Sequence, residues 1–347
     1  MKPDQTAAAV IAGNRPAEAD MIAYWEVTDS GLRPKAETVA VLAALSANTS
    51  NVEMMRSFVS YIRKTYPPIA LDGSPRAVNI VGTGGGRSTF NISTTAAFVV
   101  AAAGGRVLKS GSSAYSSSVG SGDILSALGL AGSSCDAFTE DMLGHTGMAF
   151  ASATRYAPIC KRLAIAAMPL NFKIIGRFVN ALGPMICPYE VRGSVVGTST
   201  LGLFDHMHKI SSSLGIGSLI VHSEEGVDEL LSVGTNRFVS SDSSEPQMLY
   251  PTDLGLQDGD IDALTGGDLH INLAIMKDIL RGKGHKTCTQ TVALNAGAAL
   301  YAGGFANNLQ NGTDMALECL ADGAPYRKLE QAQAYVKQGT RTLERVA

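Results

Sequence analysis

The chain has 347 residues, of which 17% are charged and 45% are hydrophobic, and its formal net charge is −3 at pH 7. This balance excludes a disordered chain, and the 37 glycines follow no Gly-X-Y period, which excludes collagen. Lysine and arginine are scattered and the five cysteines show no CxxC spacing, so the sequence predicts no nucleic-acid partner, no zinc site and no disulfide framework.

The first 66 residues are predicted to be helical. Val39, Leu42 and Leu45 recur at the spacing of one helix face. A similar pattern resumes after Asn51, which stands where a helix N-cap is expected. The turn-rich stretch 72–75 then ends the helical block and is taken as a domain boundary.

Beyond that boundary, strand and helix patterns alternate, which is the order expected of an α/β domain with a mostly parallel central sheet flanked by helices. The predicted strands are 77–81, 106–109, 191–197 and 218–222, and the predicted helices are 93–103, 124–128, 204–214, 271–280, 288–302 and 316–320. We therefore expect a helical domain over 1–70 and an α/β domain over 75–347.

The long uncharged stretch 88–105 contains Asn91 and five hydroxyl residues. A membrane-spanning helix needs about 20 predominantly apolar residues, so this stretch does not qualify. The sequence therefore predicts a cytoplasmic protein with no membrane partner.

The segment from Gly82 to Thr94 contains four glycines directly after a predicted strand and before a predicted helix. Backbone N–H groups in such a loop can surround an anion near the positive end of the helix. Hydroxyl and amide side chains in the same segment add hydrogen bonds without bulk. The spacing matches neither the Walker A nor the Rossmann pattern, and a tight turn without a ligand is the alternative interpretation.

A second polar loop is predicted between Lys109 and Asp123, where seven of fifteen residues are serine and three are glycine. Hydroxyls and amides at this density, with Lys109 as a cation, are typical of a concavity that binds phosphate. The alternative interpretation is a flexible solvated linker.

Two adjacent carboxylates, Asp228 and Glu229, follow a predicted strand. Mg²⁺ is commonly bound by one or two carboxylates together with substrate phosphates, so a metal site beside the two phosphate-type loops is favoured. In isolation, such a pair is more often the solvated start of a helix.

Several separated segments of the chain resemble the anthranilate phosphoribosyltransferases, which belong to glycosyltransferase family 3 and share a broad fold with pyrimidine nucleoside phosphorylases. These segments are Gly82-Thr-Gly-Gly85, Thr89-Phe-Asn-Ile-Ser-Thr94, Ser116-Ser117, Gly120-Ser121, Asn180-Ala-Leu-Gly-Pro184, Val227-Asp-Glu-Leu230, Gly266-Gly-Asp268 with Asn272, and Leu294-Asn-Ala-Gly-Ala-Ala-Leu300. The likeness runs from about residue 5 to residue 330, nearly the whole chain.

The resemblance implies a homodimer formed through the helical domain, with an inserted helical segment within 160–190 returning to that domain. It implies transfer of 5-phosphoribosyl from 5-phosphoribosyl diphosphate (PRPP), bound with two Mg²⁺ ions, to a small aromatic or heteroaromatic amine. Diphosphate is released and no protein nucleophile is needed.

Residue roles follow from the same resemblance, position by position. PRPP would be bound by Gly82, Thr83, Gly84, Gly85, Gly86, Thr89, Asn91, Ser93, Thr94, Lys109, Ser116, Ser117 and Ser121. Metal contacts would come from Ser93, Asp228 and Glu229, and acceptor contacts from Gly82, Ser112, Tyr156, Leu170 and Asn171.

The chain departs from the family pattern mainly where the acceptor would bind. Gly86 stands where the family has Asp, and the loop is one residue shorter. Lys109 is followed by Ser-Gly-Ser-Ser instead of His-Gly-Asn-Arg, and Tyr156-Ala-Pro replaces a His-Pro pair. Leu170 and Asn171 occupy the place of the arginine that pairs with the acceptor carboxylate.

Losing that arginine would remove a charge-assisted contact worth roughly 1.5–3 kcal/mol, or about 10–150-fold in binding. The substitutes in the sequence are Arg155, Arg162, Lys173 and Arg177. We therefore expect a phosphoribosyltransferase with a changed acceptor. The alternatives are a true anthranilate phosphoribosyltransferase of tryptophan biosynthesis, a non-catalytic paralogue that binds a phosphorylated ligand, and a nucleoside phosphorylase.

Overall fold

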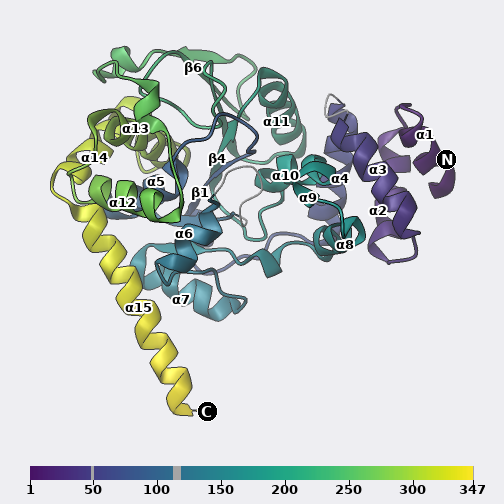
Figure 1. Ribbon diagram of the computed structural model, residues 1–347, viewed down its shortest axis with the longest axis horizontal. Coiled ribbons are helices and arrows are strands. Elements are labelled where there is room, and N and C mark those ends of the chain that lie inside the picture. Colours follow the sequence, from purple (N-terminus) through teal and green to yellow (C-terminus); the bar gives the residue numbers. More distant parts are fainter. Residues whose placement is uncertain (48–50, 112–118, 347) are drawn as a thin grey trace.

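The structure is a computed structural model that describes residues 1–47, 51–111 and 119–346, with side chains up to residue 338 (Figure 1). The predicted N-cap is present, since the Asn51 side chain accepts a hydrogen bond from the Met54 N–H (3.1 Å). No helix in these ranges is long and apolar enough to cross a membrane.

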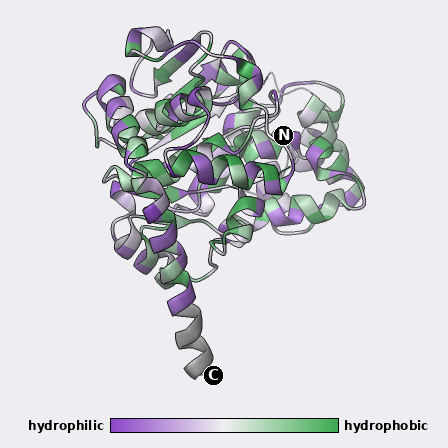
Figure 2. Ribbon diagram, turned by 60° about the vertical axis from the view of Figure 1, so that its left-hand side comes forward, coloured by the Kyte–Doolittle hydropathy of each residue, from purple (hydrophilic) through white to green (hydrophobic). Residues whose placement is uncertain are grey.

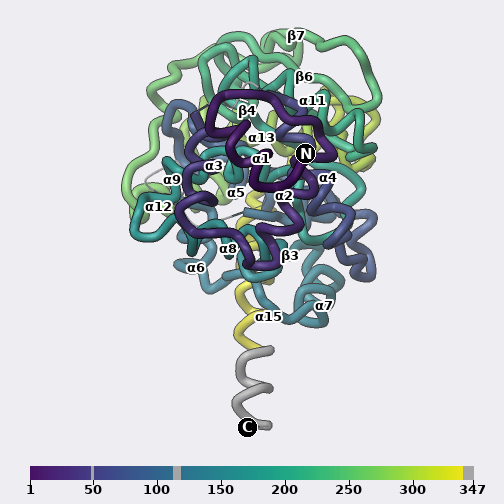
Figure 3. Tube along the Cα trace, turned by 90° about the vertical axis from the view of Figure 1, so that its right-hand side faces the viewer, coloured from purple at the N-terminus to yellow at the C-terminus, as the bar shows by residue number. Residues whose placement is uncertain are grey.

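Helices from two distant parts of the chain form one group, which lies beside the sheet in Figure 1 and nearest the viewer in Figure 3. Its N-terminal members are α1 (Pro3–Ile11), α2 (Glu18–Asp29), α3 (Lys35–Ala47) and α4 (Val52–Thr65). Its inserted members are α8 (Pro158–Ala167), α9 (Phe172–Ile175), α10 (Arg177–Leu182) and the 3-10 turn η3 (Gly183–Ile186). Buried residues of both parts, such as Trp25, Phe58 and Phe178, share one hydrophobic cluster.

Seven strands in the described residues form one sheet in the order β3-β2-β1-β4-β5-β6-β7. They are β1 (Val78–Gly82), β2 (Val107–Lys109), β3 (Met148–Phe150), β4 (Gly193–Thr198), β5 (Ser218–Ser223), β6 (Asn236–Ser240) and β7 (Gln247–Leu249). The first five pair in parallel, and β6 and β7 are antiparallel. The expected mostly parallel sheet is confirmed, with β3, β6 and β7 as additional strands.

The remaining helices cover the two faces of the sheet or lie at its rim. They are α5 (Ile92–Ala102), α6 (Ser121–Ala127), α7 (Asp136–Thr146), α11 (Leu201–Leu214), α12 (Leu269–Leu280), α13 (Lys286–Ala302), α14 (Leu309–Ala321) and α15 (Ala324–Val346). The shorter 3-10 turns are η1 (Ser74–Arg76), η2 (Ala153–Arg155), η4 (Pro251–Leu254) and η5 (Ile261–Leu264). Helix α15 packs against α5 and α7 through its first half and then extends away from the rest of the molecule (Figure 1).

Successive strand residues face opposite sides of the sheet, and both sides are buried. In β4, Val195 joins the cluster under α5 and α13, whereas Val196 joins the cluster shared with α11 and the helical group. In β2, Val107 and Leu108 divide in the same way between two clusters. Along the surrounding helices hydrophobic and hydrophilic residues alternate, as Figure 2 shows.

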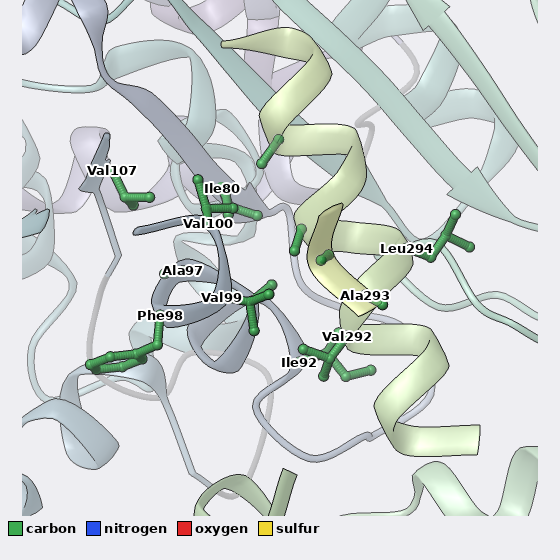
Figure 4. Packing of buried hydrophobic residues seen from close by; sticks show 14 of the residues in the cluster. Ile80, Ile92, Ala97, Phe98, Val99, Val100, Val107, Val292, Ala293 and Leu294 are labelled. Carbon is green, nitrogen blue, oxygen red and sulfur yellow. The ribbon is translucent and has the colours of Figure 1, made fainter. Parts of the chain in front are cut away.

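Helix α5 is buried between the sheet and α13, as the close view in Figure 4 shows. Ile80 of β1, Val99 of α5 and Val292 of α13 are each at most 2% exposed. Beyond its first turn α5 is apolar, as expected of a helix that meets protein on every side. This packing fixes the position of the first turn of α5.

The chain leaves β1 toward β2 on one side and leaves β4 toward β5 on the other. In open parallel sheets, ligands bind in the crevice outside the carboxyl ends of strands at such a switch point. The predicted loop at 82–94 begins at this position, at the end of β1.

Candidate active site at the carboxyl end of the sheet

The loop after β1 is a backbone-rich turn joined to the segment after β5. Gly84 and Gly85 have φ angles of 72° and 87°, a region that favours glycine. The Gly84 N–H donates to Asp228 Oδ2 (2.7 Å), and the Thr83 N–H donates to the Gly197 carbonyl (2.9 Å). The Ser199 hydroxyl donates to the Gly84 carbonyl (2.9 Å), so the loop conformation is set from two neighbouring elements.

Three glycines in this region are required by close approach. A Cβ on Gly82 would overlap the Asp228 carboxylate, and a Cβ on Gly197 would overlap the Asp228 carbonyl. A Cβ on Gly86 would overlap the carbonyl of Gly226. The absence of Asp at position 86 therefore has a steric reason in this chain, because the two loops touch there.

The first turn of α5 faces the two carboxylates. The Ser93 backbone and the Thr89 side chain lie near Glu229 and partly oppose the rise in its pKa. Asn91 donates through Nδ2 to the Val119 carbonyl (3.2 Å) and accepts from Asn272 Nδ2 (3.1 Å).

The hydroxyl of Thr94, in the same turn of α5, is buried and has no hydrogen-bond partner among the described residues. Its side chain is 1% exposed. Such an orphaned polar atom fits a polar ligand at this helix end.

Lys109 ends β2 and is 3% exposed. Its Nζ donates to the Ile80 carbonyl (2.5 Å) and to Ser93 Oγ (3.3 Å). Burial lowers the pKa of Lys109 to about 8, and the nearby Glu229 and Asp228 carboxylates partly oppose that shift. The site therefore holds a cation next to the first turn of α5.

Asp228 and Glu229 are half-buried on an irregular segment, not at the start of a helix. Burial raises the pKa of both carboxyl groups, and the neighbouring Asp228 raises the pKa of Glu229 further. Two carboxylates that lack sufficient positive charge fit a Mg²⁺ ion that takes its other ligands from phosphate. No cluster of three or more His, Cys, Asp or Glu side chains suited to a metal occurs in the part of the chain that the structure describes.

The second predicted loop borders a cavity of about 180 Å³, lined in part by Lys109, Ser110, Gly111 and Ser121. Gly111 lies so close to Ser121 that a Cβ would overlap its hydroxyl. The predicted site residues Ser112, Ser116 and Ser117 lie outside the described residues.

Asn79 shapes the site although no sequence motif contains it. Its Nδ2 donates to Ser110 Oγ (2.7 Å), and its Oδ1 accepts from the Ser110 N–H (2.9 Å). It is fully buried inside a predicted apolar strand. A polar residue within such a run is the only available signal, because its partner lies 31 positions away.

The predicted acceptor residues outside the loops lie on the inserted helical segment. Tyr156 follows the η2 turn and packs against the helical-group cluster. Leu170 is 50% exposed, and the Asn171 side chain accepts from the Lys173 N–H (2.9 Å). Their part in acceptor binding stays a prediction.

Two of the predicted substitute cations are already paired. Arg155 forms an ion pair with Asp136, and Arg162 forms one with the buried Asp29 (3.3 Å). Lys173 and Arg177 are exposed on α9 and α10.

Comparison with known proteins gives a consistent result. The profile "Glycosyl transferase family, a/b domain" matches residues 74–326. An anthranilate phosphoribosyltransferase of Synechococcus sp. (strain WH7803) is 34% identical over 302 residues, which are 86% of this chain and 86% of the relative. The crystal structure of anthranilate phosphoribosyltransferase from Thermus thermophilus has a TM-score of 0.84 at 30% identity, covering 97% of this chain and all of that one.

The fold is also that of the anthranilate phosphoribosyltransferase from Saccharomyces cerevisiae, whose structure was determined in complex with PRPP and Mg. The TM-score is 0.80 at 21% identity, with 96% of this chain and 98% of that chain covered.

Proposed function

We propose that this chain, which belongs to the anthranilate phosphoribosyltransferase family of pentosyltransferases, transfers 5-phosphoribosyl from PRPP to the nitrogen of an anthranilate-like aromatic amine and releases diphosphate. One observation carries the proposal. The glycine loop after β1, the first turn of α5, Lys109 and the two carboxylates meet at the switch point of the sheet.

The reaction breaks the bond between the sugar C1 and the diphosphate oxygen and forms a bond from C1 to the acceptor nitrogen, which gives up one proton. The sugar gains positive charge while negative charge gathers on the departing diphosphate. Backbone N–H groups of Gly85 and Gly86 and the Lys109 ammonium are suited to stabilise that charge, because they are fixed before the reaction begins. No nucleophilic side chain is required for this chemistry.

We further propose that Asp228, Glu229 and Ser93 hold two Mg²⁺ ions together with PRPP. When bound, Mg²⁺ would neutralise the diphosphate and ease its departure. Support comes from the burial of the two carboxyl groups, which raises the pKa of both, because a bound cation would stabilise their charged forms. The remaining PRPP contacts proposed are those of both loops, including Ser116, Ser117 and Ser121.

The acceptor is proposed to lie between the glycine loop and the inserted helices, near Gly82, Ser112, Tyr156, Leu170 and Asn171. Family members place an arginine at the position of Leu170, so we propose that this chain accepts a changed amine. Kinetics with anthranilate, its esters and heteroaromatic amines measure how much the acceptor carboxylate contributes. Complementation of a tryptophan auxotroph tests anthranilate directly.

We also propose that residues 1–70 with the inserted segment within 160–190 form a helical domain beside the α/β domain over 75–347, and that the protein is a cytoplasmic homodimer joined through the helical domain. Support for an interface comes from Ile165, Met168 and Ile174, which are 55%, 61% and 67% exposed on this segment. Sedimentation analysis of the chain and of an Ile174→Glu variant tests the dimer.

The decisive experiment for the activity follows diphosphate release with PRPP, Mg²⁺ and a panel of amines. Release that needs both Mg²⁺ and an amine supports the proposal. Absence of release with every amine, together with absence of PRPP binding by calorimetry, would exclude it. PRPP binding without release would instead favour a non-catalytic paralogue, and cleavage of nucleosides by inorganic phosphate would favour a phosphorylase.

A further inference from the structure

The segment that carries the two carboxylates has no regular secondary structure, although its backbone is largely buried. Val227, Leu230, Leu231 and Ser232 are all buried, and they lie in neither a helix nor a strand. Buried backbone N–H and C=O groups need hydrogen-bond partners, and here no helix or ladder supplies them. The Val227 carbonyl accepts from the Ser223 N–H (3.5 Å), whereas Leu230, Leu231 and Ser232 have side-chain partners from α13 and β6.

Asn295 of α13 binds the residue that follows Glu229. Its Oδ1 accepts from the Leu230 N–H (3.2 Å), and its Nδ2 donates to the Leu230 carbonyl (2.6 Å). A further hydrogen bond from Nδ2 to the Thr291 carbonyl (2.8 Å) ties the amide to its own helix. Asn295 is 1% exposed, so water does not compete for these groups.

Two more side chains continue the same arrangement along the segment. Asn236 accepts from the Leu231 N–H (2.8 Å) and donates to the Leu231 carbonyl (2.9 Å). The Thr291 hydroxyl accepts from the Ser232 N–H (3.2 Å). Asn236 and Thr291 are both fully buried.

On its other side the segment packs directly against the sheet. Gly197 of β4 and Gly82 of β1 leave just enough room for Asp228. The carboxylates are thus held between two strands and one helix. Rotation of the peptide at Leu230 would turn the Glu229 side chain, because the two residues share a peptide bond.

We propose that Asn295 is a positioning residue that, together with Asn236 and Thr291, holds Asp228 and Glu229 in the orientation that binds the metal. The inference rests on the proposed function, because it assumes that these carboxylates bind Mg²⁺ with PRPP. Residues that orient metal ligands typically change metal affinity by about 10–100-fold when they are replaced.

The test measures metal binding as well as turnover. Asn295→Ala and Thr291→Val are titrated with Mg²⁺ by calorimetry in the presence of PRPP, and their thermal unfolding is recorded. Thr313→Val is the matched control, because Thr313 is also fully buried in the neighbouring α14 and donates only to the Leu309 carbonyl (2.8 Å) of its own helix.

We expect Asn295→Ala to weaken Mg²⁺ binding by about 10–100-fold and Thr291→Val by a smaller factor. The control should lose thermal stability without losing Mg²⁺ affinity. Folded Asn295→Ala and Thr291→Val proteins with unchanged Mg²⁺ affinity would overturn the inference. If Asn295→Ala does not fold, the Mg²⁺ affinity of the nearly isosteric Thr291→Val protein decides whether the inference holds. Failure of the unmodified chain to bind Mg²⁺ with PRPP would instead overturn the proposed function.

Discussion

The N–H of Gly84 donates a 2.7 Å hydrogen bond to Oδ2 of Asp228, which lies 144 positions further along the chain. This bond joins the loop after β1 to the segment after β5. It also occupies one lobe of a carboxylate that would otherwise be free to rotate. The phosphate loop and the metal carboxylates of the proposed site therefore form one unit.

A methyl group at position 197 is expected to impair both activity and stability, because Gly197 lies against Asp228. Gly197→Ala would place a Cβ on the Asp228 carbonyl, so we expect loss of diphosphate release and a destabilisation of about 1–3 kcal/mol, typical of overpacking. Denaturant unfolding and turnover measure the two effects.

Gly202→Ala is the control for this prediction. A Cβ at Gly202 of α11 meets no atom within 4 Å, so alanine should stabilise the helix by about 0.5–1 kcal/mol and leave turnover intact. An active and stable Gly197→Ala protein would contradict the described approach of Asp228 to β4.

The lowered pKa of Lys109 predicts how PRPP binding depends on pH. Below about pH 8 the amine is protonated and attracts the diphosphate, and above that value the charge is lost, well before an ordinary lysine would lose it. We expect the dissociation constant for PRPP to rise as pH increases through this range. Calorimetric titration at several pH values checks the trend.

The corresponding variant is Lys109→Met, which keeps the apolar stem and removes the amine. It should bind PRPP weakly at every pH and lose the pH dependence near 8. The same pH dependence in the variant would assign it to another group.

Glu229 is expected to lower the stability of the metal-free protein at neutral pH although turnover needs it. Because burial raises its pKa, the folded chain holds this proton more tightly than the unfolded chain does. The resulting stability is present at pH values below the unfolded pKa and is lost as pH rises through the folded pKa. At neutral pH, Glu229→Gln should therefore raise the melting temperature of the metal-free protein and abolish Mg²⁺-dependent turnover.

Replacement of the exposed Glu225 by Gln serves as the comparison for Glu229→Gln. This change should affect neither the melting temperature nor turnover. A lower melting temperature for Glu229→Gln at pH 7 would contradict the raised pKa.

A buried carboxylate also joins the N-terminal helices to the inserted segment. Asp29 accepts hydrogen bonds from the hydroxyls of Tyr61 (2.7 Å) and Tyr66 (2.5 Å) and pairs with Arg162 of α8 (3.3 Å). Its side chain is 5% exposed. We expect Asp29→Ala to destabilise the chain by about 1–3 kcal/mol, because it leaves the hydroxyls of Tyr61 and Tyr66 without their acceptor.

Asp4→Ala provides the contrast, since Asp4 pairs with Arg33 but is 85% exposed. Its cost should stay below about 1 kcal/mol, as for most surface pairs. Equal losses of stability in the two variants, measured by denaturant unfolding, would show that burial of Asp29 does not matter.

Much of the fold is predictable because its hydrophobic patterns are strong. The central strands and the helices α5, α11, α12 and α13 lie close to the bounds that the sequence predicts. Strands β3 and β7, with three residues each, are too short to show a period, and β6 carries Asn236 and Arg237 within a polar stretch. The block 1–66 contains four helices, and glycine and proline stand in the first two breaks between them, at Gly13 and Pro16 and at Gly31 and Pro34.

The residues of the candidate site also differ in how far the sequence predicts them. Loop residues such as Gly84, Thr89 and Ser93 stand in a local pattern, so the sequence points to them. Asn79 is a buried amide in an apolar strand and Asn295 stands in one of the family-like segments, but their partners Ser110 and Leu230 are distant in sequence. No local pattern records such a partnership, which arises only when the strands and helices pack.

The contact between Gly86 and Gly226 constrains how this sequence can change. An aspartate at position 86, as the family has, would collide with the loop after β5 unless that loop moved first. The two positions are therefore epistatic: Gly86→Asp alone should damage the protein, whereas the same change combined with a redesigned 224–226 turn should be tolerated. To acquire the family-type loop, this chain would have to change the 224–226 turn before, or together with, position 86.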